Sequence, residues 1–185
     1  MRSLVRSTLR EGGLHRSVLI GSLLRCGLAT ALLLATASTT HQRAEARSFP
    51  TPRFVSLKAP RANLRVGPGV QYGIEWVFVR KGIPLEIYQA FGNWRRVRDW
   101  EGTSGWIYGP LLSGQRTAVT APWSRDNVAL HTSPVAASPL TAWLEPDVTV
   151  KLLRCDGQWC RVAHNSMVGF VKQFALWGAY PGEVL

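Results

Sequence analysis

Two stretches of the chain repeat one pattern of apolar and polar positions. In the first, Ile83, Leu85 and Ile87 alternate with Pro and Glu, and in the second, residues 148–152 alternate in the same way as Val-Thr-Val-Lys-Leu. Alternation with a period of two is typical of a strand with one buried face. Both stretches are therefore predicted to be β-strands.

The residues that follow these strands also repeat, which indicates an internal duplication. Both copies continue with Gly-x-Trp-x-x-Val and then with Gly, an aromatic residue and an apolar residue, at 92–97 and 105–107 and again at 157–162 and 169–171. The register is unbroken from position 83 to position 97, where each position aligns with the one 65 positions later. Because repeats of this kind are structural units, the chain is expected to contain two similar domains.

Each repeated motif also predicts a tight hairpin. Gly92-Asn93 and Gly157-Gln158 place Gly first in a two-residue loop, as a type II′ turn requires. Trp159 and Val162 fall on opposite faces of a regular strand, so a bulge or burial on both faces is expected. Gly67-Pro68-Gly69 further predicts a type II turn.

The expected fold class is all-β, with two tandem small β-barrels after an N-terminal signal peptide. Units of about 60 residues are too short for a large sandwich, and a small barrel hides its strand edges. Eight Trp and seventeen Gly favour short strands and tight turns. We expect the first domain at 53–112, a linker at 113–123 and the second domain at 124–178.

The first 46 residues are interpreted as a signal peptide. Arg residues precede an apolar stretch at 26–37, and Ala44-Glu45-Ala46 fits a small-residue cleavage site, with cleavage after Ala46. Ala37 ends an alternative site. Arg25 interrupts the apolar run, which argues against a stable membrane anchor. The expected location of the cleaved chain is periplasmic or extracytoplasmic.

Three segments of the first copy resemble a bacterial SH3 domain of the kind found in exported envelope proteins. They are Asn63-Leu-Arg-Val-Gly-Pro-Gly69, Gly92-Asn-Trp-Arg-Arg-Val97 and Gly105-Trp-Ile107. The second copy keeps the later two patterns but has Ala129-Leu-His-Thr-Ser-Pro134 in place of the first. The resemblance implies that the two barrels are SH3-like and that they form a non-catalytic module that binds cell-wall peptide, glycan or protein.

Five side chains of the first copy are candidate ligand-binding residues: Tyr72, Trp76, Arg95, Arg96 and Trp100. Aromatic rings beside Arg side chains are suited to stacking on an extended ligand or hydrogen bonding to it. The alternative is that the rings cap the ends of the barrel. Since the second copy lacks the first-loop motif, we expect it to have lost this loop and the first copy to do most of the binding.

Cys155 and Cys160 are predicted to form a disulfide. A two-residue loop at 157–158 places them directly opposite each other in the hairpin, at a Cα separation that a disulfide tolerates. Export would place them in an oxidising compartment. The competing interpretations are a metal site with His164 and His131, or a Cys160–His164 nucleophile pair. The spacing matches no familiar zinc motif, and no catalytic residue, metal or cofactor is expected.

Charge narrows the choice of partner. The net charge is +11, but residues 1–47 hold seven Arg and two acids, which leaves a net +6 for the rest of the chain. We interpret Glu86, Asp99 and Glu101 as solvated charges. The cluster Arg95-Arg96-Val97-Arg98 is compatible with nucleic acid, but export favours an anionic envelope polymer. The leading hypothesis is cell-wall binding, and the alternative is an envelope protein-protein adaptor.

Overall fold

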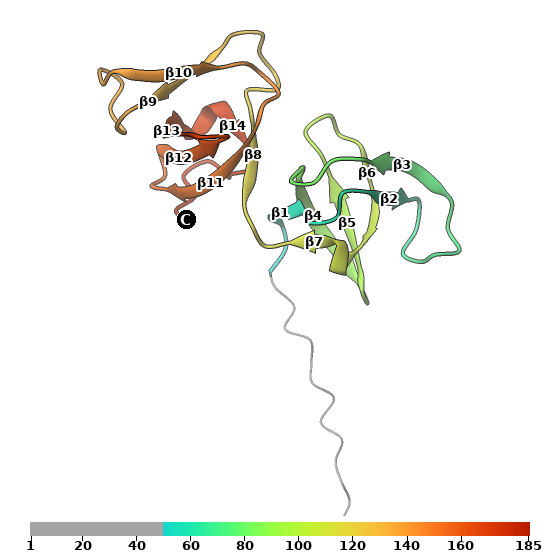
Figure 1. Ribbon diagram of the computed structural model, residues 1–185. Helices are drawn as coiled ribbons and strands as arrows, with labels where there is room; N and C mark the ends of the chain where they lie inside the picture. Colours follow the sequence, from blue (N-terminus) through green and yellow to red (C-terminus); the bar gives the residue numbers. More distant parts are fainter. Residues whose placement is uncertain (1–49) are drawn as a thin grey trace, which may run out of the picture. The chain divides into compact units, whose positions relative to one another are not determined.

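The computed structural model describes residues 50–185, all within one compact unit (Figure 1). The expected signal peptide, with both candidate cleavage positions, lies outside these residues. From residue 50 onward, no helix is long and apolar enough to cross a membrane.

The first half of the described chain forms a seven-stranded antiparallel sheet. Along the sheet the strands follow the order β3-β2-β6-β5-β4-β1-β7. A single 3₁₀ turn, η1 (Gly109–Leu111), connects the last two strands in sequence. The strands are β1 (Arg53–Leu57), β2 (Ala62–Arg65), β3 (Ile74–Phe78), β4 (Pro84–Phe91), β5 (Trp94–Arg98), β6 (Ser104–Tyr108) and β7 (Leu112–Ser113).

The second half forms another seven-stranded sheet with the equivalent strand order, β10-β9-β13-β12-β11-β8-β14. It too has one 3₁₀ turn, η2 (Gln173–Ala175). Its strands are β8 (Thr117–Thr120), β9 (Val128–His131), β10 (Leu140–Leu144), β11 (Thr149–Cys155), β12 (Trp159–His164), β13 (Met167–Lys172) and β14 (Leu176–Trp177). The all-β tandem fold is therefore confirmed, and we call the two halves the first and second barrel.

The segment 113–123, expected to be a linker, contains strand β8. Residues Thr117–Thr120 pair with β11 and β14, and all four are buried. Burial on both faces removes the apolar-polar alternation by which a strand is recognised in a sequence. The segment is thus part of the second sheet.

Each barrel has its own apolar core. Leu64, Leu85, Val97 and Ile107 fill the first, and each is fully buried. The residues at the matching positions of the second repeat, Leu130, Val150, Val162 and Val171, fill the second core and are at most 1% exposed. The duplicated pattern of apolar residues therefore packs in the same way twice.

The irregularities of the sheets are duplicated as well. The pairing of β4 with β5 shifts between Ile87 and Gln89, and that of β11 with β12 shifts between Leu152 and Arg154, which are the matching positions. Trp159 and Val162 are both buried, and the bulge on β11 lies opposite Arg161 and Val162. The predicted bulge and the predicted burial on two faces thus both occur.

At two positions of the repeat, steric crowding explains why the residue is Gly. A Cβ on Gly105 would lie 2.8 Å from the carbonyl oxygen of Arg65, and one on Gly169 would lie 2.7 Å from that of His131. Only Gly lets β6 and β13 approach their neighbouring strands this closely. Gly92 and Gly157 have φ of 51° and 95°, which L side chains rarely adopt, and they open the two predicted hairpin loops.

Glu86 is 4% exposed, so its interpretation as a solvated charge is wrong. Its carboxylate accepts a hydrogen bond from Arg98 and another, 2.8 Å long, from the hydroxyl of Tyr180, which lies just after the second repeat. Burial and the hydrogen bond to Glu86 raise the pKa of the Tyr180 hydroxyl. Because Tyr180 lies more than ninety positions from Glu86, the sequence around Glu86 does not indicate that this carboxylate is buried.

Candidate functional site

The long loop after β2 forms one side of a groove on the first barrel. Its base is closed by a hydrogen bond from the Val66 amide to the Gly73 carbonyl, 3.1 Å long. Within it, the Gly69 amide donates to the carbonyl of Gly67, 3.0 Å away, which is a γ-turn centred on Pro68. Gly69 does not have a positive φ, so the predicted type II turn is wrong. The ring of Pro68 fixes φ in a range that an inverse γ-turn also accepts.

The loop after β9 keeps the same hydrogen bonds without the same sequence. The Thr132 amide donates to the Pro139 carbonyl at 3.0 Å, and the Val135 amide donates to the Ser133 carbonyl at 2.8 Å across Pro134. Each bond lies 66 positions after its counterpart. The expectation that the second copy had lost this loop is therefore wrong, because backbone groups and one proline are sufficient to form it.

One side chain in each barrel fastens this loop to the preceding strand. In the first barrel Arg65 donates a 2.6 Å hydrogen bond to the carbonyl of Tyr72. In the second barrel His131 occupies the matching position, and its Nδ1 lies 3.3 Å from the carbonyl of Ser138. The Arg of the Asn-Leu-Arg motif thus has a structural role that His131 reproduces.

The first barrel's groove, of about 750 Å³, lies between β2, the loop 66–73 and the end of β6. Trp94 and Tyr108 form its aromatic wall, with ring centroids 5.6 Å apart. Tyr108 is 41% exposed. Because they stand on paired strands, the two rings present a fixed surface to a ligand. We call this groove the first groove.

Positive charge dominates the first groove. Arg61 and Arg65 line it together with the amides of Asn63 and Gln71, and no Asp or Glu is among its lining residues. Guanidinium groups bind carboxylates and phosphates in a planar, two-point geometry. The groove therefore favours an extended ligand that carries acidic groups.

The five candidate binding residues do not form one site. Trp76 and Trp100 line a different depression, of about 320 Å³, shared with Asp99 and Glu101. Trp76 is 53% exposed there. Arg80 lines it as well, whereas the two Arg candidates, Arg95 and Arg96, do not.

The remaining candidates lie elsewhere. Arg95 donates to the carbonyls of Gly92 and Trp94 and lines a third depression. Arg96 lies over the ring of Tyr88, 5.5 Å from its centroid. Tyr72 belongs to the loop 66–73, and its ring packs over Gly67. Whether these five side chains contact a ligand stays a prediction.

Sequence reasoning missed most of the first groove. Trp94 was interpreted as part of a repeated structural motif, and its counterpart Trp159 is indeed only 5% exposed. Arg61 and Tyr108 lie in no motif. The repeat itself holds a signal for these two residues, because Tyr108 aligns with Lys172 and Arg61 aligns with Asn127. Positions at which the two copies differ are not needed for the shared fold, so they are candidates for ligand contact.

Asp99 is 6% exposed, so its interpretation as a solvated charge is also wrong. Burial raises the pKa of its carboxyl group, while hydrogen bonds from the amides of Thr103 and Glu101 act in the opposite direction. The carboxylate closes the turn between β5 and β6. Its role is therefore structural.

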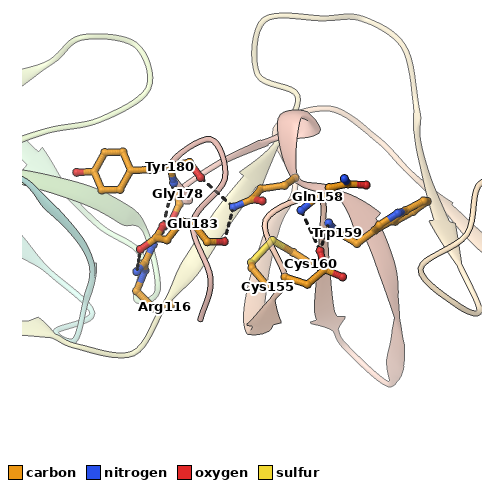
Figure 2. The surroundings of a disulfide bond; sticks show 10 residues. Arg116, Cys155, Gln158, Trp159, Cys160, Gly178, Tyr180 and Glu183 are labelled. Atoms are coloured by element: carbon orange, nitrogen blue, oxygen red, sulfur yellow. Dashed lines mark hydrogen bonds and ion pairs between the residues drawn. A yellow bond between two sulfur atoms is a disulfide. The ribbon is translucent and has the colours of Figure 1, made fainter.

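Cys155 and Cys160 form the predicted disulfide, with a Cα separation of 4.1 Å (Figure 2). They face each other in the register of β11 and β12, as expected. His164 bonds through Nδ1 to the carbonyl of Thr149, 3.0 Å away. Among residues 50–185, no cluster of three or more His, Cys, Asp or Glu side chains is arranged to hold a metal ion.

The C-terminal segment is fastened beside this disulfide, as Figure 2 shows. Arg116 bonds both carboxylate oxygens of Glu183, at 2.8 and 2.9 Å, and Gln173 donates to the carbonyls of Tyr180 and Glu183. Burial opposes ionisation of Glu183, but the hydrogen bonds from Arg116 and the Tyr180 amide leave its pKa lowered. The segment is therefore an ordered part of the second barrel.

The family model of the bacterial SH3 domain matches the chain twice, at residues 58–114 and 124–178. The chain belongs to the bacterial SH3 domain family. One matched segment lies in each of the two sheets and leaves out only its first strand, β1 or β8, so the predicted family is confirmed.

Solved structures with similarity to the chain include NlpC2 from Trichomonas vaginalis, with 16% identity, coverage of 70% of this chain and 49% of that one, and a TM-score of 0.32. An NlpC/P60 family protein from Bacillus cereus ATCC 10987 has 12% identity, coverage of 67% and 55%, and a TM-score of 0.30. The chain spans about half the length of these structures. No curated protein matched the chain.

Proposed function

We propose that this chain is an exported, non-catalytic protein that binds the cell wall, and that the first groove receives an extended, acidic wall peptide. The observation that carries the proposal is the composition of this groove. Two Arg side chains and an exposed aromatic pair line it, and no acidic side chain does. Membership in the bacterial SH3 domain family supports a binding role.

The chemistry of wall peptides fits this surface. Their free carboxylates would pair with Arg61 and Arg65, and their extended backbone would pass over the rings of Trp94 and Tyr108. The signal-peptide pattern of residues 1–46 supports a location outside the cytoplasm, where such a ligand is available.

A pull-down on purified wall sacculi tests the proposal. The double variant Arg61→Glu with Tyr108→Ala should bind at least roughly tenfold more weakly, because it reverses one charge and removes one aromatic wall. The matched control is Arg161→Glu, which makes the same charge change on exposed β12. Equal retention of both variants and the wild type would contradict binding at the first groove.

Two further arms of this experiment separate the alternatives. Trp76→Ala asks whether the depression shared with Trp100 contributes to retention. If the wild-type chain is not retained on sacculi at all, wall binding is wrong, and the envelope adaptor becomes the better hypothesis. Capture of an envelope protein by the same wild-type chain would then support the adaptor directly.

A further inference from the structure

The second barrel has a groove of its own at the corresponding end, of about 310 Å³. Its lining includes Ala129, His131 and Lys172, which correspond in the repeat to Asn63, Arg65 and Tyr108 of the first groove. We call it the second groove. Its chemistry differs from that of the first groove at nearly every lining position.

Three large aromatic side chains line the second groove and remain open to solvent. Trp123 is 61% exposed, Trp143 is 60% exposed and Phe174 is 78% exposed. Exposed rings cost solubility, and clustered ones mark interaction sites more often than isolated ones do. Trp143 stands on β10 opposite Ala129, whose small side chain leaves the indole uncovered.

The rings belong to well-anchored segments. Trp123 lies in the connection 121–127 between β8 and β9, which has seven residues, whereas the equivalent connection 58–61 has four. The Ala121 amide donates to the Ala175 carbonyl, 2.8 Å away, which joins this connection to η2 and to Phe174. Ala121 has a φ of 27°, which is uncommon for a residue other than Gly. The insertion thus adds a tryptophan where the first barrel has none.

The aromatic wall of the first groove is absent from the second. Trp159, the counterpart of Trp94, is covered on one side by Lys172, whose Nζ lies 4.1 Å from the ring centroid. His131 meets the same ring edge-on, with centroids 5.2 Å apart. A ligand of the first groove therefore has no matching surface here, and Trp123, Trp143 and Phe174 provide a different one.

The polar groups of the second groove carry both signs of charge. Asp126 and Lys172 both line it, along with the amide of Asn127. The Asp126 carboxylate is exposed and has one long contact, 3.4 Å, with the hydroxyl of Ser124. Carboxylate and amide groups beside open aromatic faces match a neutral ligand that has many hydroxyl groups and flat apolar faces.

We propose that the second groove binds a sugar chain of the wall, with neutral N-acetylated hexose units stacked on the exposed rings. The negative face of an indole attracts the slightly positive C–H groups of a sugar ring, and Asp126 and Asn127 accept and donate hydrogen bonds to its hydroxyl groups. This inference rests on the proposed function in one respect, namely that the sugar chain comes from the cell wall. The chain would then hold wall peptide with one barrel and wall glycan with the other.

A titration of the chain with the β-1,4-linked tetramer of N-acetylglucosamine, followed by NMR, tests this. The indole N–H signals of Trp123 and Trp143 should shift, and that of Trp94 should not. Trp123→Ala should weaken the binding at least roughly tenfold, since stacked aromatic anchors dominate such contacts. Phe91→Ala, which removes a similarly exposed aromatic ring from β4 of the first barrel, is the control and should bind like the wild type.

The outcomes separate this proposal from the proposed function. No shift at Trp123 and Trp143, or equal affinity of the Trp123→Ala variant at unchanged unfolding temperature, overturns the glycan site and leaves wall-peptide binding at the first groove intact. A shift of the same indoles by a proline-rich peptide, without a shift by the tetramer, also overturns it. Tetramer binding without retention of acidic wall peptide would instead overturn the proposed function alone.

Discussion

The two barrels share a backbone but differ in the side chains that they expose. Strand order, both bulges and the hydrogen bonds of the long loop recur at matching positions. The exposed ends of the barrels have diverged, since Arg61 and Tyr108 line one groove and Asn127 and Lys172 line the other. The comparison shows that the two copies keep one scaffold, which backbone geometry determines, while their exposed positions differ.

The largest effect is expected at the shared glycine. Gly105→Ala or Gly169→Ala would each place a Cβ less than 3 Å from a neighbouring carbonyl oxygen, so strands must move apart. Each variant should lose about 1–3 kcal/mol of unfolding free energy, as overpacked cores do. Denaturant unfolding measures it, with Gly114→Ala as the control because no atom lies within 4 Å of its added Cβ. If only one of the two substitutions lowers the unfolding free energy, the two scaffolds are less alike than their hydrogen bonds indicate.

The disulfide distinguishes the barrels, so its reduction should destabilise only the second. Cys155 and Cys160 enclose a very short loop, and the chain-entropy relation gives about 2 kcal/mol for it. Amide hydrogen exchange with and without reductant would show faster exchange in β11 and β12 and unchanged exchange in β4 and β5. Faster exchange in both barrels would contradict this independence.

The smallest expected effect is at the side chain that fastens each long loop. Arg65→Ala removes one hydrogen bond to the loop backbone, worth about 1 kcal/mol, and His131→Ala removes the matching bond together with the edge-on contact of its ring with Trp159. Exchange of the loop amides should rise in the mutated barrel only. Arg65→His places the residue of the second barrel in the first. If this variant keeps the slow amide exchange of the wild type, the two side chains are equivalent.

Local features of both barrels could be predicted from the sequence, while distant contacts could not. The disulfide followed from a two-residue hairpin loop, and the cores followed from alternation within single strands. The burial of Glu86 could not be predicted, because Tyr180, ninety-four positions later, covers it. Strand β8 could not be predicted because both of its faces are buried. The loop of the second barrel was missed because its backbone hydrogen bonds survive the loss of the first copy's side-chain motif.

The candidate site was predicted less well than the fold, for a related reason. Trp94 and Trp159 share one motif, yet Trp94 lines a groove and Trp159 lies beneath His131 and Lys172. Which member of a repeated pair is accessible depends on the residues that cover it. Those residues come from other strands, and no periodicity in the sequence reveals them.

The most direct test of the account is an NMR titration of the chain with a soluble, sugar-free wall tetrapeptide. The account predicts that amide shifts concentrate at 61–71 and 108–111 and include the indole of Trp94, with the signals of 121–131 unchanged. Shifts concentrated in the second barrel, or spread equally over both, would contradict the claim that the two barrels share a scaffold but present separate binding surfaces.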